Sequence, residues 1–142
     1  MKMRIFYSAD SDPMILDSVK NLNEIYKELV EFTESEIQKV KINAIVKGSP
    51  EPYSEFLPYI ELWKSEGKVL VKFSENRGLI ITGSTANLIK YIEAFRFGAD
   101  EDGNHHHPEF ELVNENSFSM DGLWPFIEAD NDYVAEHQAF AS

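Results

Sequence analysis

Three short strand-like segments near the middle of the chain constrain its fold more than any other feature. They span residues 59–64, 68–74 and 78–82, and only residues 65–67 and 75–77 separate them. Gaps of this length with glycine and asparagine are typical of β-hairpins. Because sequential strands joined by such short links run antiparallel, the sequence predicts a meander here, with Val69, Val71 and Phe73 facing the core.

Two helices are predicted, one before this meander in the sequence and one after it. Asp12 followed by Pro13 is a helix-start signal, because aspartate accepts orphan amide hydrogens and proline tolerates the first helical position. The first helix is expected to run to about residue 33 with one apolar face. That face contains Ile15, Val19, Leu22, Tyr26 and Leu29. A second helix is expected to begin at a cap on Ser84 or Thr85 and to stop at Gly98.

Further strands are predicted at residues 2–8, 40–46, 105–112 and 122–128. The expected fold class is α+β, with one antiparallel sheet of about six to seven strands in a meander and two helices on one face. Residues 1–130 are expected to form a single domain, since the chain length of 142 residues suits one domain. Residues 131–142 show no clear pattern and are expected to be a loose tail or a short terminal helix.

Charge is distributed unevenly along the chain. Residues 1–96 contain 14 acids and 13 bases, whereas residues 97–142 contain 11 acids and neither lysine nor arginine. An acidic segment of this kind repels nucleic acid and favours encounter with a basic protein, because complementary potentials raise association rates. The alternative, that the acids only keep a small protein in solution, stays open from charge alone.

Composition and motifs exclude several classes of chemistry. The sequence contains no cysteine, which excludes disulfides, thiolate zinc sites and a cysteine nucleophile. It has neither a phosphate-binding glycine loop nor a serine nucleophile elbow, so we expect no cofactor and no enzyme activity. The absence of a signal-like start or a long apolar run leads us to expect a cytoplasmic protein without membrane attachment.

The run His105-His106-His107 is the one cluster with obvious chemical potential. On an extended strand, one side carries His105, His107, Glu109 and Glu111. Two imidazoles and a carboxylate there could bind zinc or iron, or supply a general base. Next-but-one residues diverge along a strand, however, so a third ligand would have to come from elsewhere. A metal-binding protein or metal-dependent enzyme is therefore one alternative, and histidines that pack under the second helix are another.

The last predicted strand suggests a further alternative. Trp124 and Phe126 lie on one side of it and Leu123 and Ile127 nearly opposite, so both faces are apolar. One face could be covered by a second copy of the chain, which would make the protein a homodimeric structural or regulatory module.

Several segments in order resemble the immunity protein 32 family, whose members protect bacteria from polymorphic toxins. They are residues 78–84 (GLIITGS), the helix with Leu88, Ile92 and Phe95, residues 105–110 (HHHPEF) and residues 124–128 (WPFIE). The resemblance covers roughly residues 68–130 and leaves about 65 N-terminal residues without a counterpart. It implies a protein that binds and neutralises a cognate toxin without cofactor or turnover.

Toxins of this class are often nucleases with a basic substrate groove, which an acidic surface could occupy in place of phosphate. We therefore expect a toxin as the partner and an acidic, histidine-containing contact surface. The residues expected to form or border it are Asp100, Glu101, Asp102, His105, His107 and Glu109.

Overall fold

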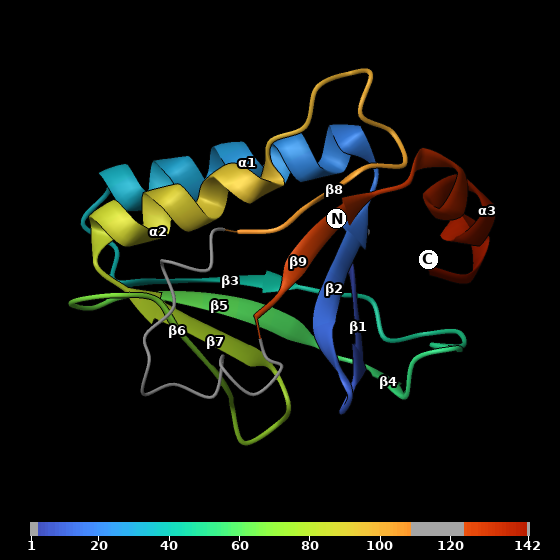
Figure 1. Cartoon of the computed structure of the whole chain (residues 1–142), viewed down its shortest axis with the longest axis horizontal. Helices are drawn as coiled ribbons and strands as arrows, with labels where there is room; N and C mark the ends of the chain where they lie inside the picture. The colour runs from blue at the N-terminus through green and yellow to red at the C-terminus, as the bar shows by residue number, and fades with distance from the viewer. Residues whose placement is uncertain (1–2, 109–123, 142) are drawn as a thin grey trace.

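The structure is a computed structural model that describes residues 3–108 and 124–141, and it confirms the predicted α+β class (Figure 1). Within these residues nine strands form two mixed sheets, one of five strands and one of four, and there are three α-helices. The strands are β1 (Arg4–Ser8), β2 (Ser11–Asp17), β3 (Lys39–Asn43), β4 (Glu55–Phe56), β5 (Tyr59–Lys64), β6 (Leu70–Phe73), β7 (Leu79–Gly83), β8 (His105–His106) and β9 (Phe126–Ala129). The helices are α1 (Val19–Glu34), α2 (Thr85–Ile92) with the 3-10 turn η1 (Glu93–Phe95), and α3 (Asn131–Ala141).

The predicted single antiparallel sheet is wrong, because each of the two sheets contains a parallel pair. The larger sheet has the order β4-β1-β2-β9-β8, in which β2 and β9 are parallel and the other neighbours antiparallel. The first and last thirds of the chain therefore meet in the middle of this sheet. In the register of the parallel pair, Met14 lies beside Phe126 and Asp17 beside Ala129.

The predicted meander is also wrong, although its strands lie close to where they were expected. The smaller sheet has the order β3-β5-β7-β6, so β7 lies between β5 and β6 and runs parallel to β5. The link between β5 and β6 passes across the end of β7. Two backbone hydrogen bonds hold it there, Ser65 N to Gly83 O at 2.8 Å and Ser84 N to Gly67 O at 3.0 Å. A short link thus skips one strand position, which spacing alone does not reveal.

The first helix begins later than predicted, because residues 11–17 form β2. Pro13 is tolerated in this strand because it lies beside a register irregularity of β1 and before the pairing with β9 begins. Asp12 Oδ1 accepts a hydrogen bond from Trp124 N at 3.1 Å instead of capping a helix. The cap of α1 is Ser18, whose Oγ accepts from Asn21 N at 3.1 Å.

The cap on the second helix is confirmed, and its predicted stop is not. Ser84 Oγ accepts a hydrogen bond from Asn87 N at 3.2 Å at the start of α2. The helix ends at Ile92 and continues as η1 to Phe95, after which Arg96 is already extended, so the chain leaves the helix before Gly98. Of the two expectations for the C-terminal residues, the short helix is correct and forms α3.

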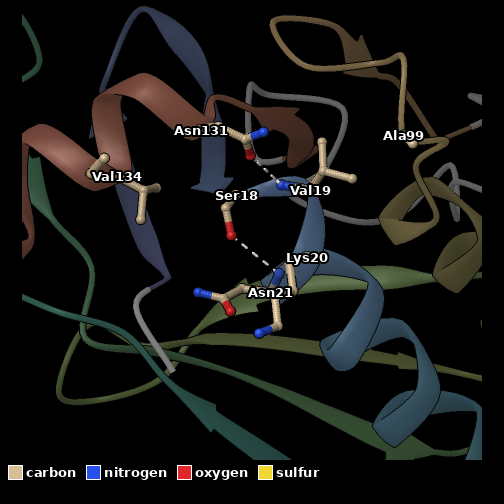
Figure 2. Close-up of a pocket in the computed structure, with 8 residues that line it drawn as sticks. Ser18, Val19, Lys20, Asn21, Ala99, Asn131 and Val134 are labelled. Carbon is tan, nitrogen blue, oxygen red and sulfur yellow. Dashed lines mark hydrogen bonds between the residues drawn. The ribbon is translucent and has the colours of Figure 1, made fainter.

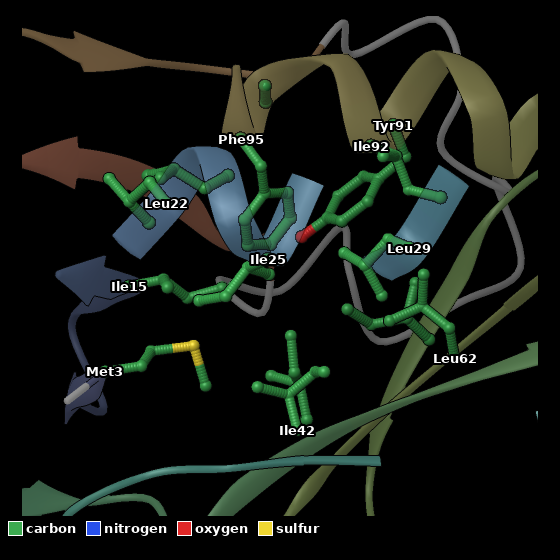
Figure 3. Close-up of a cluster of buried hydrophobic side chains, with 14 of the residues drawn as sticks. Met3, Ile15, Leu22, Ile25, Leu29, Ile42, Leu62, Tyr91, Ile92 and Phe95 are labelled. Carbon is green, nitrogen blue, oxygen red and sulfur yellow. The ribbon is translucent and has the colours of Figure 1, made fainter. Parts of the chain in front are cut away.

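One apolar core joins both sheets to α1 and α2, which lie side by side above them (Figure 1). The buried face of α1 includes Leu22, Ile25 and Leu29, which pack with Tyr91 and Phe95 from α2 and η1 (Figure 3). Burial of side chains this large dominates the stability of a domain of this size. Tyr26, predicted on the buried face, is only partly buried, and Ile25 takes its place.

The other face of the larger sheet carries a second, smaller cluster. Phe6, Met14 and Leu16 form its buried centre. Tyr53, Phe56, Phe126 and Tyr133 are partly buried around them. The Tyr133 ring of α3 lies 6.0 Å from the Phe6 ring, so α3 packs against the face opposite to α1 and α2.

Gly78 provides a test of packing in the smaller sheet. A β-carbon at this position would stand 2.1 Å from Cε1 of Tyr59, so the ring occupies the space of the missing side chain. The Tyr59 hydroxyl also hydrogen-bonds to Ser74 Oγ at 2.7 Å. We expect Gly78→Ala to lower the free energy of unfolding by about 1 to 3 kcal/mol, because the ring must move. Urea denaturation measures the change.

A double-mutant cycle provides the control for this prediction. In a Tyr59→Ala background the ring is absent, and Gly78→Ala should cost much less than in the parent protein. An equal cost in both backgrounds would show that the close contact is not the cause.

Candidate functional site

The first turns of α1 and α3 lie next to each other, because the strands that precede them are parallel neighbours. At the ends of these strands Asp130 N donates to Asp17 O at 3.0 Å. Asn131, the first residue of α3, accepts a hydrogen bond at its Oδ1 from Val19 N at 2.9 Å (Figure 2). The start of α3 is therefore attached to the start of α1.

An open hollow of about 610 Å³ lies between the starts of the two helices (Figure 2). Its lining comes from the first turn of α1, from Ala99 and from α3. The lining residues are Ser18, Val19, Lys20, Asn21, Ala99, Asn131, Val134 and Ala135. The amides of Val19 and Asn21 are already capped by Asn131 and Ser18, so these two amides are not available to an external anion.

The acidic loop of residues 99–104 is tied to the start of α3. Asp102 Oδ1 accepts a hydrogen bond from Asn131 N at 2.7 Å. Two backbone hydrogen bonds extend the β8/β9 pairing into the loop, from Gly103 N to Ala129 O at 2.7 Å and from Ala129 N to Asn104 O at 2.9 Å. The loop consequently has a defined position beside the hollow.

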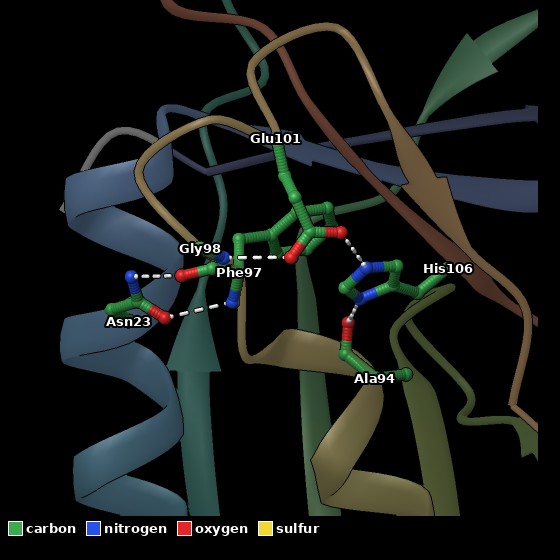
Figure 4. Close-up of polar contacts among 6 residues, drawn as sticks. All are labelled: Asn23, Ala94, Phe97, Gly98, Glu101 and His106. Atoms are coloured by element: carbon green, nitrogen blue, oxygen red, sulfur yellow. Dashed lines mark hydrogen bonds and ion pairs between the residues drawn. The ribbon is translucent and has the colours of Figure 1, made fainter.

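Glu101 and His106 hold the other side of the same loop (Figure 4). Glu101 Oε1 accepts from Gly98 N at 2.7 Å, and Oε2 lies 2.8 Å from His106 Nε2. The second ring nitrogen of His106 lies 3.1 Å from Ala94 O. The ring stacks on Phe97 at a centroid distance of 3.9 Å. We call these two residues, Glu101 and His106, the loop clamp.

Asn23 connects the loop clamp to α1 (Figure 4). Its side-chain amide donates to Phe97 O at 2.8 Å and accepts from Phe97 N at 2.9 Å, which satisfies both backbone groups of that residue. Because the Phe97 ring supports His106, the amide of Asn23 indirectly positions the clamp. Backbone N–H and C=O groups just after a helix have no partner within the helix, and Asn23 satisfies both of these groups of Phe97.

Hydrogen bonding lowers the pKa of Glu101, first through Gly98 N and then through His106, so the carboxylate is favoured. Both ring nitrogens of His106 lie within hydrogen-bond distance of an oxygen atom, Nε2 beside Glu101 Oε2 and Nδ1 beside Ala94 O. The loop clamp thus joins the carboxylate of Glu101 to a ring nitrogen of His106, and hydrogen bonds to a carboxylate are stronger than those between neutral groups.

The structure separates the predicted contact residues into three groups. Asp100 and Asp102 are exposed on the loop, whereas Glu101 is partly buried and directed inward to His106. His105 and His107 are exposed on the outer face of the larger sheet. Glu109 lies outside the described residues.

His105 and His107 share one side of their segment and His106 faces the other, as expected for an extended chain. The rings of His105 and His107 are 4.9 Å apart, and His107 stacks on Phe126 at 5.0 Å. In residues 3–108 and 124–141, no group of three His, Asp or Glu side chains gathers closely enough to hold a metal ion. The two rings contact each other and the ring of Phe126.

Two further acids near the ends of β2 and β9 have shifted pKa values. Burial raises the pKa of Asp17, against the hydrogen bonds from Asn21 and Ser18 that favour its carboxylate. Burial also raises the pKa of Glu128, against the opposing effect of His105 on the neighbouring strand. Neither group is among the residues that line the hollow.

The structure places α3 at the site, and the sequence did not predict a role there for these residues. Asp130 caps this helix, its Oδ1 accepting from Tyr133 N at 2.9 Å, and Asp132 and Glu136 are exposed on it. An aspartate before a first-turn aspartate is a helix-start signal that could have indicated α3. Its proximity to the acidic loop depends on the β2/β9 pairing and has no local signal.

No family model, curated protein or solved structure matches this chain. Among the described residues, no helix is long and apolar enough to cross a membrane.

We expect Glu101→Gln to lower the melting temperature at neutral pH, because glutamine retains the hydrogen-bond oxygen but not the charge opposite His106. The folded-state pKa of Glu101 lies below the usual 4.5, so its charge contributes stability above pH 4.5. This contribution is lost as the pH falls through the lower folded-state value. Thermal unfolding followed by circular dichroism should show the two proteins converging in acid.

The matched control for this prediction is Asp100→Asn, which removes an exposed acid from the same loop. It should leave the melting temperature nearly unchanged at all pH values. Equal effects of the two variants would mean that loop charge in general, and not the clamp, sets the stability.

Proposed function

We propose that this chain is a non-catalytic binding protein of the bacterial immunity type, and that it docks a basic partner through the acidic rim of the hollow between α1 and α3. The observation that carries this proposal is the Asp102–Asn131 hydrogen bond, which joins the acidic loop to an acidic helix. We define the acidic rim as Asp100, Asp102, Asp132 and Glu136, all exposed.

The charge around the hollow suits a basic partner. The acids of the rim adjoin lining residues along the chain, since Asp100 follows Ala99 and Asp132 and Glu136 follow Asn131 and Ala135. Lys20 is the one base among the described residues that line the hollow. Complementary potentials accelerate docking and exclude partners of like charge. The hollow itself provides a concave surface into which a side chain of the partner can fit.

The rim is held in place before any partner arrives. The loop clamp fixes one side of the loop, and the bonds of Asp102 and Gly103 fix the other. A preorganised surface loses less conformational entropy on binding than a mobile one. Two of the acids predicted to contact the partner thus also serve to order the loop.

The nature of the partner follows from the resemblance to the immunity protein 32 family and from the charge. A toxin nuclease has a basic groove for phosphates, and a rigid carboxylate surface can occupy it without being cleaved. The bound immunity protein would then block access of nucleic acid. No cofactor or turnover is required for this activity.

Neutralising the rim tests the proposal. We expect the variant with Asp100→Asn, Asp102→Asn, Asp132→Asn and Glu136→Gln to bind the partner about tenfold more weakly or worse at low salt, because steering charges are lost. Asparagine at position 102 retains an oxygen for Asn131 N. The partner is first captured on the parent protein from the native host and identified by mass spectrometry, and its affinity is then measured across ionic strength.

A variant matched in charge serves as the control. It carries Glu31→Gln, Glu34→Gln, Glu66→Gln and Glu75→Gln, which remove four exposed acids elsewhere on the surface. It should retain nearly the parent affinity and should protect bacteria that express the captured partner. Equal losses in both variants, or none in the rim variant, would remove the rim from the interface, and a captured partner that is harmless to bacteria would exclude the immunity function.

A further inference from the structure

Arg4 is a buried arginine with an incompletely satisfied guanidinium group. Only 4% of the residue is exposed, on the face of the larger sheet that α3 covers. Nη1 donates to Lys47 O at 2.6 Å, and the guanidinium lies 5.1 Å from the centre of the Phe56 ring. Nη2 is buried and has no hydrogen-bond partner. A buried charged donor without a hydrogen-bond partner lowers the stability of the folded state, so Nη2 is expected to have a partner that the chain itself does not supply.

Within residues 3–108 and 124–141, Arg4 also lacks an anionic partner. Among the residues that the structure describes, the ion pairs are Arg77–Glu55, Arg96–Glu93 and His106–Glu101, and none involves Arg4. Buried charges are normally paired. In a chain with a formal net charge of −12, a buried arginine without a carboxylate is all the more unusual.

A cavity of about 260 Å³ lies beside this guanidinium group. Its lining residues are Arg4, Gly48, Ser49, Tyr133 and His137. Gly48 has a φ of +96° and no side chain, and a β-carbon there would stand 3.6 Å from Nη1 and 4.0 Å from Nη2. Both nitrogens therefore face the Gly48 side of the cavity.

Two stacked rings form the wall that α3 contributes. The Tyr133 and His137 rings lie 4.0 Å apart at an angle of 20°. The apolar part of a flat ligand can pack against these two rings, and a negatively charged group of the same ligand can contact Arg4. The volume is smaller than that of most ligand pockets, which begin at roughly 300 Å³, so only a small molecule fits.

The charge of the ligand is limited by the acids nearby. Tyr133, which lines the cavity, is under the opposing electrostatic effects of Arg4 and of the acids Asp130 and Glu136. A single negative charge is balanced by Arg4, whereas a phosphate dianion would be repelled by these two carboxylates. The shared chemistry is therefore that of an organic monocarboxylate.

We propose that the cavity between Arg4, Gly48 and the Tyr133–His137 wall binds a small organic monocarboxylate, whose carboxylate accepts a hydrogen bond from Nη2 of Arg4. This site lies on the outer face of the larger sheet and does not depend on the proposed immunity function. The carboxylate satisfies the unpartnered donor, and the body of the ligand rests against the two rings.

Titration with benzoate tests this site, with benzamide and inorganic phosphate as comparison probes. We expect one benzoate per chain by calorimetry, with shifts of the Arg4 and Tyr133 resonances in NMR spectra. Benzamide has the same ring without the charge and should bind about tenfold more weakly or worse, because a charge-assisted hydrogen bond is lost. Phosphate should also bind more weakly than benzoate.

Two kinds of variant locate the binding. Arg4→Met should abolish benzoate binding, and Ser49→Phe, which closes the cavity and leaves Arg4 in place, should do the same if Arg4→Met fails to fold. Ser49→Ala keeps the cavity open and should bind benzoate within about twofold of the parent, a difference of less than 0.5 kcal/mol. Unchanged benzoate binding by Ser49→Phe, equal affinity for benzamide, or tighter binding of phosphate would each overturn the proposal.

Discussion

The parallel pairing of β2 with β9 is the constraint on which the rest of the molecule depends. Parallel neighbours end at the same edge of a sheet, so the helices that follow them, α1 and α3, begin side by side. Asn131 can then cap Val19 across more than a hundred residues of sequence. The hollow, the acidic loop beside it and the position of α3 all result from this one pairing.

Carboxylates of the acidic loop and of the start of α3 have two different roles. Glu101 hydrogen-bonds to His106 in the loop clamp, and Asp130 caps α3. Asp102 accepts a hydrogen bond from Asn131 N and remains exposed. Some carboxylates of the acidic C-terminal third therefore fix the loop and α3 through hydrogen bonds, and others provide surface charge. The hydrogen-bonded carboxylates hold the exposed carboxylates in fixed positions, which lowers the entropy cost of docking.

The two faces of the larger sheet are also used differently. The inner face merges with the core under α1 and α2, whereas the outer face carries aromatic side chains and the buried guanidinium of Arg4. Tyr133 on α3 closes part of this outer face. The α3 helix therefore belongs to both proposed sites, with Asp132 at the hollow and Tyr133 at the cavity.

Local sequence was sufficient to predict the α+β class, the position of most strands, the Ser84 cap and the alternation of His105 and His107, because propensity, side-chain periodicity and capping act over a few residues. It failed at Asp12-Pro13, where Pro13 lies in β2 beside a register irregularity of β1. It also failed at the order of the strands in both sheets. Strand order is decided by contacts between distant residues in the common core. An apolar pattern predicts that a strand is buried but not which strand lies beside it, because the hydrophobic effect is non-directional.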